Sequence, residues 1–431
     1  MKYWVKMRIK LNMIKQFTNS ILHPLGLGYL NLNWTKSRYI IPLLFLLIGT
    51  WSCSEQKKEK SAKKYSVWMA ESEMERFPEL WTVDNVRIPF WGYTHGIIAK
   101  SMLDMYAYTN DKKYYDYVLD YADTLIKPEG YIVTYDSSKH NIDMINPGKI
   151  LFPMYQYTGL QKYQEAAGTL VDAMRNHPTT SEGGFWHKKR YIHQMWLDGL
   201  YMGAPFLAQY AEEFESDSLF DVVATQIRLI DKYAFDPETS LYYHGWDESK
   251  SMLWADSVTG TSPNFWGRSV GWFAMALVDV LDYFPENHPD RSMIVEVLQK
   301  TAKGIKNYQD QKSGAWYQVM DQGDREGNYL ESTASSMFVY SLYKAVRNGY
   351  IDESYQEVAN KGYHGLLNEF IKENEDGTIS LTRGCAVAGL GGKNDRDGSY
   401  EYYISEPIRD DDPKGVGPFI WASMEYEMLV K

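Results

Sequence analysis

The sequence is poor in cysteine and has no excess of positive charge. Its 431 residues include two cysteines, Cys53 and Cys385, which are too few for a framework of disulfides. It has 45 basic residues against 56 acidic ones, which gives a formal net charge of -11 with histidine neutral. Proteins that bind the phosphate backbone of nucleic acids carry a basic face, so this balance argues against a nucleic-acid partner.

A hydrophobic run at residues 39–50 is too short to span a membrane. It carries no charge and follows Lys36 and Arg38, an arrangement typical of the apolar part of a secretory signal. Ser52 places a small residue directly before Cys53, as in bacterial lipoprotein signals whose cysteine is lipidated after cleavage. The segment before Lys36 is unusually long for such a signal, which leaves open a start codon placed too early.

Residues 54–64 are mostly charged and contain no large apolar side chain, which is typical of a flexible tether. We therefore expect a signal segment at 1–52, a lipid-anchored tether at 53–65 and a single catalytic domain at 66–431. The protein is expected to be exported and held in the bacterial cell envelope, in the periplasm or at the outer membrane. Its contact with the membrane would be through the lipid on Cys53 alone.

Aromatic residues make up 15% of the chain, with 35 Tyr and 14 Trp. This excess suits a pocket that stacks ring-shaped ligands, and carbohydrate is the first candidate. The alternative for any single Tyr is a place at a helix interface.

Five amphipathic segments show apolar residues at helical spacing, and each follows a more apolar helical stretch. The apolar stretches, and a sixth near the C-terminus, open near a small residue: Gly96, Gly148, Gly203, Gly271, Ser336 and Gly417. The intervals of about 50–80 residues exceed the ~34–47 residues of most open superhelical repeats. Apolar helices that alternate with amphipathic ones suit an inner and an outer ring. The sequence thus predicts an all-α fold, an (α/α)6 barrel of six helical hairpins, with an open superhelix as the alternative.

Unusual polar and aromatic residues share one position in the repeat, just before each apolar helix. They are Trp91, Tyr93 and His95, then Asp143 and Asn146, Trp196 and Asp198, Trp266 and Arg268, Glu331 and Ser332, and finally Asp410–Asp412. In a closed ring they would meet at one end. Helix N-termini carry partial positive charge and free N–H groups, so that end favours an anionic ligand.

Asp198 and Arg268 point most directly to chemistry. Asp198 follows Trp196 in an apolar segment, where the neutral carboxyl is favoured, as in a general acid. Arg268 lies between two indoles at a helix start, where the dipole opposes a cation, so we expect it to clamp an anionic ligand. Asp143 precedes a proline and is equally well explained as a helix cap.

His187 and His244 lie among aromatic residues, where a lone histidine is more often structural than catalytic. No cluster with zinc spacing occurs in the sequence, so neither a metal nor a cofactor is expected.

Several motifs together resemble one known family. They are Asp143-x-x-Asn-Pro-Gly148, Trp196-x-Asp-Gly-Leu-Tyr-Met202, His244, Trp266-Gly-Arg-x-x-Gly-Trp272 and Gly415-x-Gly-Pro-Phe419. Residues 68–431 are similar to glycoside hydrolase family 105, the unsaturated rhamnogalacturonyl hydrolases, and more distantly to the family 88 unsaturated glucuronyl hydrolases. The resemblance implies an (α/α)6 barrel without a metal.

The resemblance also implies roles for particular residues. Asp198 matches the acid/base of the family and Asp143 its second acid. The matching pocket positions are His187, Trp196, His244, Trp266, Arg268 and Trp272. Tyr93 and His95 join the substrate-binding candidates because of their place before the first apolar helix.

The implied reaction removes a 4,5-unsaturated uronic acid from the non-reducing end of oligosaccharides left by polysaccharide lyases, such as those from pectin. It proceeds by hydration of a vinyl ether with Asp198 as general acid/base. One alternative is an inverting glycosidase with Asp143 and Asp198 ~6.5–9.5 Å apart. Another is a surface lipoprotein that binds glycans without cleaving them. In each case we expect a monomer or weak oligomer.

Overall fold

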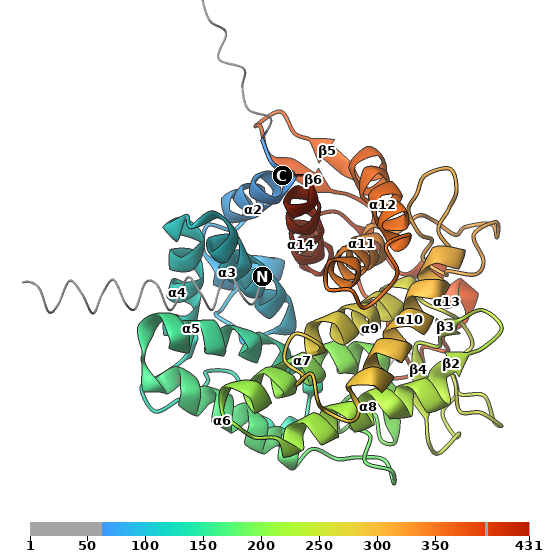
Figure 1. Cartoon of the computed structure of the whole chain (residues 1–431), viewed down its shortest axis with the longest axis horizontal. Helices are drawn as coiled ribbons and strands as arrows, with labels where there is room; N and C mark the ends of the chain where they lie inside the picture. The colour runs from blue at the N-terminus through green and yellow to red at the C-terminus, as the bar shows by residue number, and fades with distance from the viewer. Residues whose placement is uncertain (1–62, 393–394, 431) are drawn as a thin grey trace, which may run out of the picture. The chain divides into compact units, whose positions relative to one another are not determined.

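Six inner helical segments surround a common centre in the computed structural model, which describes residues 63–392 and 395–430 (Figure 1). They are α3 (Tyr93–Thr109), η3 (Ile142–Ile150) continued by α5 (Leu151–Thr158), α7 (Leu197–Glu213), α9 (Gly267–Val280), α11 (Ser332–Arg347) and α14 (Pro413–Leu429). Each segment contacts the next, and α14 contacts α3. The ring is therefore closed, which excludes the open superhelix.

An outer layer of helices covers this inner ring. It consists of α2 (Tyr65–Arg76), α4 (Lys112–Leu125), α6 (Gln161–Arg175), α8 (Ser218–Ala234), α10 (Arg291–Asn307) and α12 (Tyr355–Glu369). Five of them coincide with the predicted amphipathic segments. The sixth, α2, precedes the first hairpin and packs against α14. The predicted (α/α)6 barrel is confirmed, with α2 as an outer helix that the prediction did not include.

The difference between the two layers follows from burial. In α9 nearly every side chain is buried, from Gly267 to Val280, whereas α8 buries one stripe that includes Phe220, Val223 and Ile227. A helix surrounded by others needs apolar residues all round, while a covering helix needs only an apolar face. The distribution of apolar residues in a helix therefore indicates whether that helix belongs to the inner or the outer layer.

Small residues let the inner helices approach one another closely. A Cβ on Gly417 of α14 would lie 2.4 Å from the Ile97 Cγ2 of α3. A Cβ on Gly96 of α3 would lie 2.6 Å from the backbone of Pro147 in η3. Side chains at these glycines would force the helices apart, so the glycines define two of the closest contacts of the ring.

Short elements fill the connections between helices. In the part of the chain that the structure describes, the strands form four antiparallel pairs: β1 (Gln194–Trp196) with β4 (Gly245–Asp247), β2 (Phe235–Asp236) with β3 (Leu241–Tyr242), β5 (Ile371–Glu373) with β6 (Ile379–Leu381), and β7 (Gly384–Cys385) with β8 (Ile408–Arg409). The remaining short helices are η1 (Leu80–Asn85), η2 (Ser137–Lys139) and α13 (Tyr400–Ser405).

The expected signal segment and Cys53 lie outside the described residues, so their roles stay predictions. Tyr65, which we expected to end the tether, instead begins α2. Of the helices that the structure describes, none is both long enough and apolar enough to cross a membrane.

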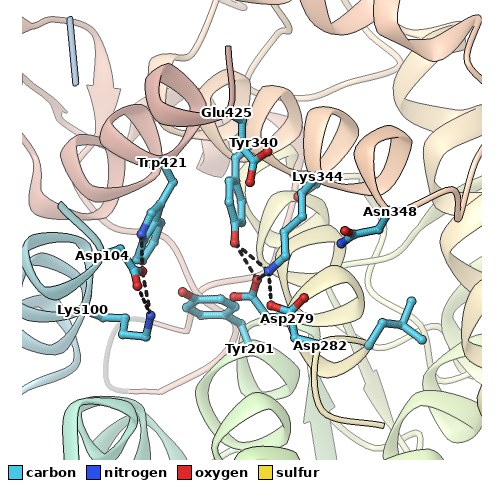
Figure 2. A network of polar contacts seen from close by, with 12 residues as sticks. Lys100, Asp104, Tyr201, Asp279, Asp282, Tyr340, Lys344, Asn348, Trp421 and Glu425 are labelled. Carbon is cyan, nitrogen blue, oxygen red and sulfur yellow. Dashed lines mark hydrogen bonds and ion pairs between the residues drawn. The ribbon is translucent and has the colours of Figure 1, made fainter. Parts of the chain in front are cut away.

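Several charges inside the ring are paired across helices. Lys344 of α11 contacts Asp279 of α9 at 2.6 Å and Asp282 at 2.7 Å, and the Tyr340 hydroxyl donates to Asp279 at 2.7 Å (Figure 2). Burial disfavours both charges, but the opposite charges raise the pKa of Lys344 and lower that of Asp279. This network joins α9 to α11 near their C-terminal ends.

A second set of contacts continues around the ring. The Trp421 indole of α14 donates to Asp104 of α3 at 2.9 Å, and Lys100 pairs with the same carboxylate at 2.6 Å (Figure 2). Arg347 of α11 pairs with Glu425 of α14 at 2.6 Å. Paired polar groups thus connect four of the inner helices.

Replacing Lys344 with Met should destabilise the fold strongly. The Lys344 side chain is 6% exposed, and its loss leaves the partly buried carboxylates of Asp279 and Asp282 without the cation that pairs with both. Breaking a buried pair in this way costs about 3–5 kcal/mol. Urea unfolding measures the change in the free energy of unfolding.

Arg228→Met is the matched control, because the Arg228 side chain is 48% exposed and pairs with Asp290 on the surface. Exposed pairs contribute about 0–1 kcal/mol. Equal losses of stability in the two variants would contradict the role given to the buried network.

Candidate active site

A pocket opens at the end of the ring where the inner helices begin. It encloses about 230 Å³. Ligand pockets are commonly about 300–1,000 Å³. This pocket is smaller, so its size suits a single ring at the end of a ligand. Its lining residues are Tyr93, Asp143, His187, Lys188, Arg190, Tyr191, Trp196, Asp198, Met202, Trp266, Arg268, Trp272, Val387, Ala388, Arg396 and Lys414.

Eight of the ten predicted site residues line this pocket: Tyr93, Asp143, His187, Trp196, Asp198, Trp266, Arg268 and Trp272. His244 is fully buried and lies behind Asp198. His95 does not line the pocket. It is buried, its Nε2 lies 3.2 Å from the backbone oxygen of Trp81, and its ring stacks on Tyr121. These contacts give His95 a structural place instead of one in the pocket.

The Asp198–His244 pair is built by a strand pairing. Asp198 is in the first turn of α7, directly after β1, and His244 directly precedes β4. β1 pairs with β4, and the amide of Leu197 donates to the backbone oxygen of His244 at 3.0 Å. The Asp198 Oδ2 and His244 Nε2 atoms consequently lie 3.3 Å apart, although neither has a well-aligned hydrogen bond among the described residues.

Tyr403 of α13 fixes the other side of His244. Its hydroxyl lies 2.8 Å from the His244 Nδ1, and its ring stacks on Trp266 at 5.9 Å. The Gln318 amide donates to the backbone oxygen of Tyr403 at 3.1 Å. The imidazole is thereby held between a hydroxyl and the carboxylate of Asp198.

The pKa of Asp198 differs from the expectation. Burial raises it, as the aromatic surroundings suggested, but His244, His187 and Arg268 outweigh burial and lower the pKa below its ordinary value. In the free protein, positive charge and imidazole donors therefore favour the carboxylate form of Asp198. The expectation of a neutral carboxyl in the free protein is wrong.

Asp143 is not the cap of its helical segment. Asn141 has that role, since its Oδ1 accepts a hydrogen bond from the Asp143 amide at 3.2 Å. The Asp143 carboxylate instead lies 2.5 Å from the Lys188 Nζ and 3.4 Å from the His187 Nε2. The capping explanation of Asp143 is therefore wrong, and its carboxylate belongs to the pocket.

His187 is part of an aromatic stack at the pocket wall. Its ring lies 4.4 Å from that of Trp196 with an interplanar angle of 13°, and Tyr191 stacks on the same indole at 4.6 Å. Burial lowers the pKa of His187 to about 4, although Asp143 acts in the opposite direction. A neutral imidazole can donate to or accept from a sugar hydroxyl.

Arg268 lies deep in the pocket, only 1% exposed. Its Nη1 donates to the backbone oxygen of Cys385, and its guanidinium carbon lies 4.8 Å from the Trp266 ring centroid. Burial disfavours the charge, but Cys385, Asp412 and Glu331 raise the pKa of Arg268. Its Nε is buried and has no hydrogen-bond partner among the described residues.

The other polar helix starts are structural. Glu331 caps α11 through the Ala334 amide at 2.6 Å and also accepts from the Cys385 amide at 2.8 Å. Asp412 caps α14 and pairs with the Lys414 Nζ at 2.8 Å. Of the residues near the acidic run, it is Lys414 that lines the pocket.

Several functional candidates carry no signal in the sequence. Lys188 follows a predicted histidine and is the one whose position offered a hint. Arg190 lies in the loop between His187 and Trp196. Arg396 and Tyr403 stand in a loop and a short helix remote from the motifs, and the fold brings them to the pocket and to His244. Their sequence positions do not follow the helical repeat, so periodicity could not reveal them.

Within the described ranges, no group of three or more His, Cys, Asp or Glu side chains has an arrangement that would hold a metal ion. The pocket offers two carboxylates, the imidazole of His187 and cationic side chains, with the imidazole of His244 buried behind Asp198. Such a set can transfer protons and bind an anionic ring.

Comparisons with known proteins agree with this architecture. A family model described as Glycosyl Hydrolase Family 88 matches residues 65–430. A solved family 105 glycoside hydrolase from C. acetobutylicum ATCC 824 is 47% identical, with a TM-score of 0.82, and the match covers 85% of this chain and 100% of that one.

Two curated proteins are also similar. Protein Atu3128 of Agrobacterium fabrum strain C58 is 38% identical over 239 residues, which are 53% of this chain and 100% of that protein. The unsaturated rhamnogalacturonyl hydrolase YesR of Bacillus subtilis strain 168 is 24% identical over 304 residues, which are 69% of this chain and 80% of that protein.

We expect the imidazole of His187 to titrate near pH 4, because burial disfavours its charged form. An unfolded histidine titrates near pH ~6.5. As pH falls below that value, the unfolded chain binds the proton first, so His187 should lower the stability of the fold progressively down to its own pKa. NMR titration of labelled histidine measures the first effect, and unfolding at several pH values measures the second.

The His187→Gln variant assigns the histidine resonance that titrates at low pH, because that resonance should be missing from its spectrum. The same variant is the control for stability, since the free energy of unfolding should depend less on pH. An imidazole signal that titrates near its ordinary value and is lost in this variant would contradict the expectation.

Proposed function

Because the chain belongs to glycosyl hydrolase family 88, we propose that it removes a 4,5-unsaturated uronic acid from the non-reducing end of lyase-generated oligosaccharides. The chain is a glycoside hydrolase, and its likeness to a family 105 structure confirms the resemblance seen in its motifs. The name of the B. subtilis relative supports rhamnogalacturonyl substrates, with rhamnose as the sugar that follows the uronide.

One observation carries the proposal: a carboxylate paired with a fixed imidazole shares a small pocket with a deeply buried arginine. Asp198 and His244 are 3.3 Å apart, and Arg268 lines the same pocket with its Nε unpartnered among the described residues. A terminal uronic acid presents a carboxylate and a reactive double bond on one ring. The pocket thus offers a cation for the first and a proton donor for the second.

In the proposed reaction, Asp198 transfers its proton to C4 of the unsaturated ring. The electrons of the C4=C5 double bond form the new C–H bond, and the positive charge at C5 is shared with the ring oxygen. Water then adds to C5 and gives a proton to the Asp198 carboxylate. The resulting hemiketal opens its ring, and the hemiacetal left at C1 releases the next sugar.

Substrate binding would change the protonation of Asp198. In the free protein, His244, His187 and Arg268 favour its ionised form. A substrate carboxylate beside Arg268 would offset that positive charge, and the bound ring would exclude water. Burial would then favour the neutral carboxyl, which is the form that donates a proton.

Asp143 has a different role in this proposal. Its carboxylate is engaged by Lys188 at 2.5 Å and by His187 at 3.4 Å, so it is held in place at the pocket wall. There it would accept hydrogen bonds from ring hydroxyls and position the sugar against Asp198. Charge-assisted hydrogen bonds of this type contribute about 1.5–3 kcal/mol.

Asp198→Asn should lower kcat by at least ~10²–10⁴, the usual contribution of a positioned acid or base. The amide keeps the shape of the carboxyl but cannot donate the proton, so substrate binding should be nearly intact. Loss of the ultraviolet absorbance of the unsaturated uronide measures turnover, and calorimetry measures binding. Because the acid acts in its protonated form, wild-type activity should decline as pH rises through the pKa of Asp198 in the complex.

Asp143→Asn is compared with Asp198→Asn. It should lower turnover because the sugar is no longer positioned correctly against Asp198. If Asp198→Asn keeps near wild-type absorbance loss, Asp143 becomes the leading acid. An inverting glycosidase would instead cleave saturated oligosaccharides, and its reaction would leave the absorbance of an unsaturated end unchanged. A glycan-binding lipoprotein would show no turnover in wild type or variant.

We also propose that Cys53 is lipidated and that the protein is held in the cell envelope. The apolar run at 39–50, the small residue before Cys53 and the charged residues after it support this. In a Gram-negative host, the full chain should enter the membrane fraction and incorporate labelled fatty acid, and Cys53→Ser should abolish both. A wild-type chain without lipid in the cytoplasm would contradict the proposal.

A further inference from the structure

The pocket holds more positive charge than one uronate carboxylate needs. Five cationic side chains line it: Lys188, Arg190, Arg268, Arg396 and Lys414. Lys188 pairs with Asp143 and Lys414 with Asp412. Arg190 and Arg396 form no ion pair with any residue in the part of the chain that the structure describes.

Arg396 is nevertheless held in place. Its Nε donates to the backbone oxygen of Gly391 at 2.8 Å, and its Nη2 donates to the Tyr191 hydroxyl at 3.0 Å and to the backbone oxygen of Leu390 at 3.3 Å. All three acceptors are neutral, so the charge of the guanidinium is not compensated by them. A cation that is already ordered loses little entropy when it binds an anion.

Arg190 and Arg396 meet at the same tyrosine. The guanidinium carbon of Arg190 lies 4.7 Å from the centroid of the Tyr191 ring, while Arg396 contacts its hydroxyl. Tyr191 in turn stacks on Trp196, two residues before Asp198. We call Arg190, Tyr191 and Arg396 the outer cationic cluster.

Exposure distinguishes this cluster from Arg268. Arg268 is fully buried, Arg396 is half-buried and Arg190 is exposed. The cluster therefore occupies the part of the pocket nearer the solvent, whereas Arg268 lies at its depth. In an enzyme that takes the terminal sugar into the pocket, the sugars that follow lie toward the solvent.

We propose that the outer cationic cluster binds a second anionic group, a carboxylate or a sulfate, on the portion of the oligosaccharide beyond the unsaturated uronide. The proposal rests on the function proposed above and adds a preference for substrates that carry at least two negative charges. The planar guanidinium matches the paired oxygens of either group, which an ammonium does not.

Gly389 offers a way to move Arg396 without removing its charge. A Cβ on Gly389 would lie 2.4 Å from the Arg396 Nη1. Gly389→Ala therefore displaces the guanidinium from its neutral acceptors, while Arg396→Gln removes the charge. Together the two variants separate the position of the cation from its presence.

The experiment compares three unsaturated oligosaccharides of equal length: one neutral beyond the terminal uronide, one with a further carboxylate and one with a sulfate. The readout is the ratio of kcat/KM for each charged substrate to that for the neutral one, measured by loss of absorbance. Arg396→Gln should lower this ratio tenfold or more, mainly through KM, and Gly389→Ala should lower it in the same direction. Higher ionic strength should reduce the wild-type ratio, because exposed charges are screened by salt.

Arg228→Gln on the outer helix α8 is the control and should keep the wild-type ratio. A ratio that falls for one charged substrate alone identifies the group that is bound. Equal losses on charged and neutral substrates would overturn the proposal, because the cluster would then have no part in charge recognition.

Binding to Asp198→Asn protein keeps this test independent of turnover. Calorimetry with the same three oligosaccharides, with and without Arg396→Gln, should show the same loss of preference in Kd. If wild type consumes none of the substrates but the preference in Kd depends on Arg396, the proposed reaction fails and the cluster stands. If the reaction proceeds and neither ratio depends on Arg396, the cluster proposal fails and the function stands.

Discussion

Helices that are covered on every side need a protein partner for each polar atom, and this constraint organises the inner ring. Near the C-terminal ends of α9 and α11 it is satisfied, where Lys344 joins Asp279 and Asp282. At the other end of the ring it is not. The Asp198 Oδ2 and the Arg268 Nε are buried without a hydrogen-bond partner among the described residues. Paired charges thus stabilise one end of the ring, whereas the other end contains buried polar atoms that no described residue satisfies.

Local charge in the pocket is opposite to that of the chain. The whole sequence has a net charge of -11, yet Arg268 and Arg396 line the pocket together with three further cationic side chains. Field strength inside a small, poorly solvated space is set by the nearest groups and not by the total charge. His244 and His187 lower the pKa of Asp198, and Arg268 adds to their effect. Under the proposed mechanism, the anionic substrate itself prepares the acid, so the free protein does not hold a proton donor ready for water.

The fold was largely predictable because burial repeats with the helices. Small residues such as Gly96 and Gly417 indicated where inner helices begin. Asp198 and Arg268 were recognised as site candidates because they lie at the start of an apolar helix, α7 and α9 respectively. Glu331 and Asp412 also precede apolar helices, but they are there because their side chains cap α11 and α14. What remained hidden was α2, which lies before the first repeat, and the contacts of Tyr403 and Arg396. Those contacts depend on how loops fold over the ring, and no period in the sequence records that.

Closure of the ring joins segments from opposite ends of the described chain. The amide and hydroxyl of Ser66 in α2 donate to the Glu427 carboxylate of α14 at 3.0 and 2.7 Å, across 361 residues of sequence. During synthesis, neither α3 nor α11 can gain its last inner neighbour until α14 has left the ribosome. The side of α3 that faces α14 remains uncovered for most of translation, and contacts this distant in sequence form slowly. The ring therefore closes only after the last inner helix has been synthesised.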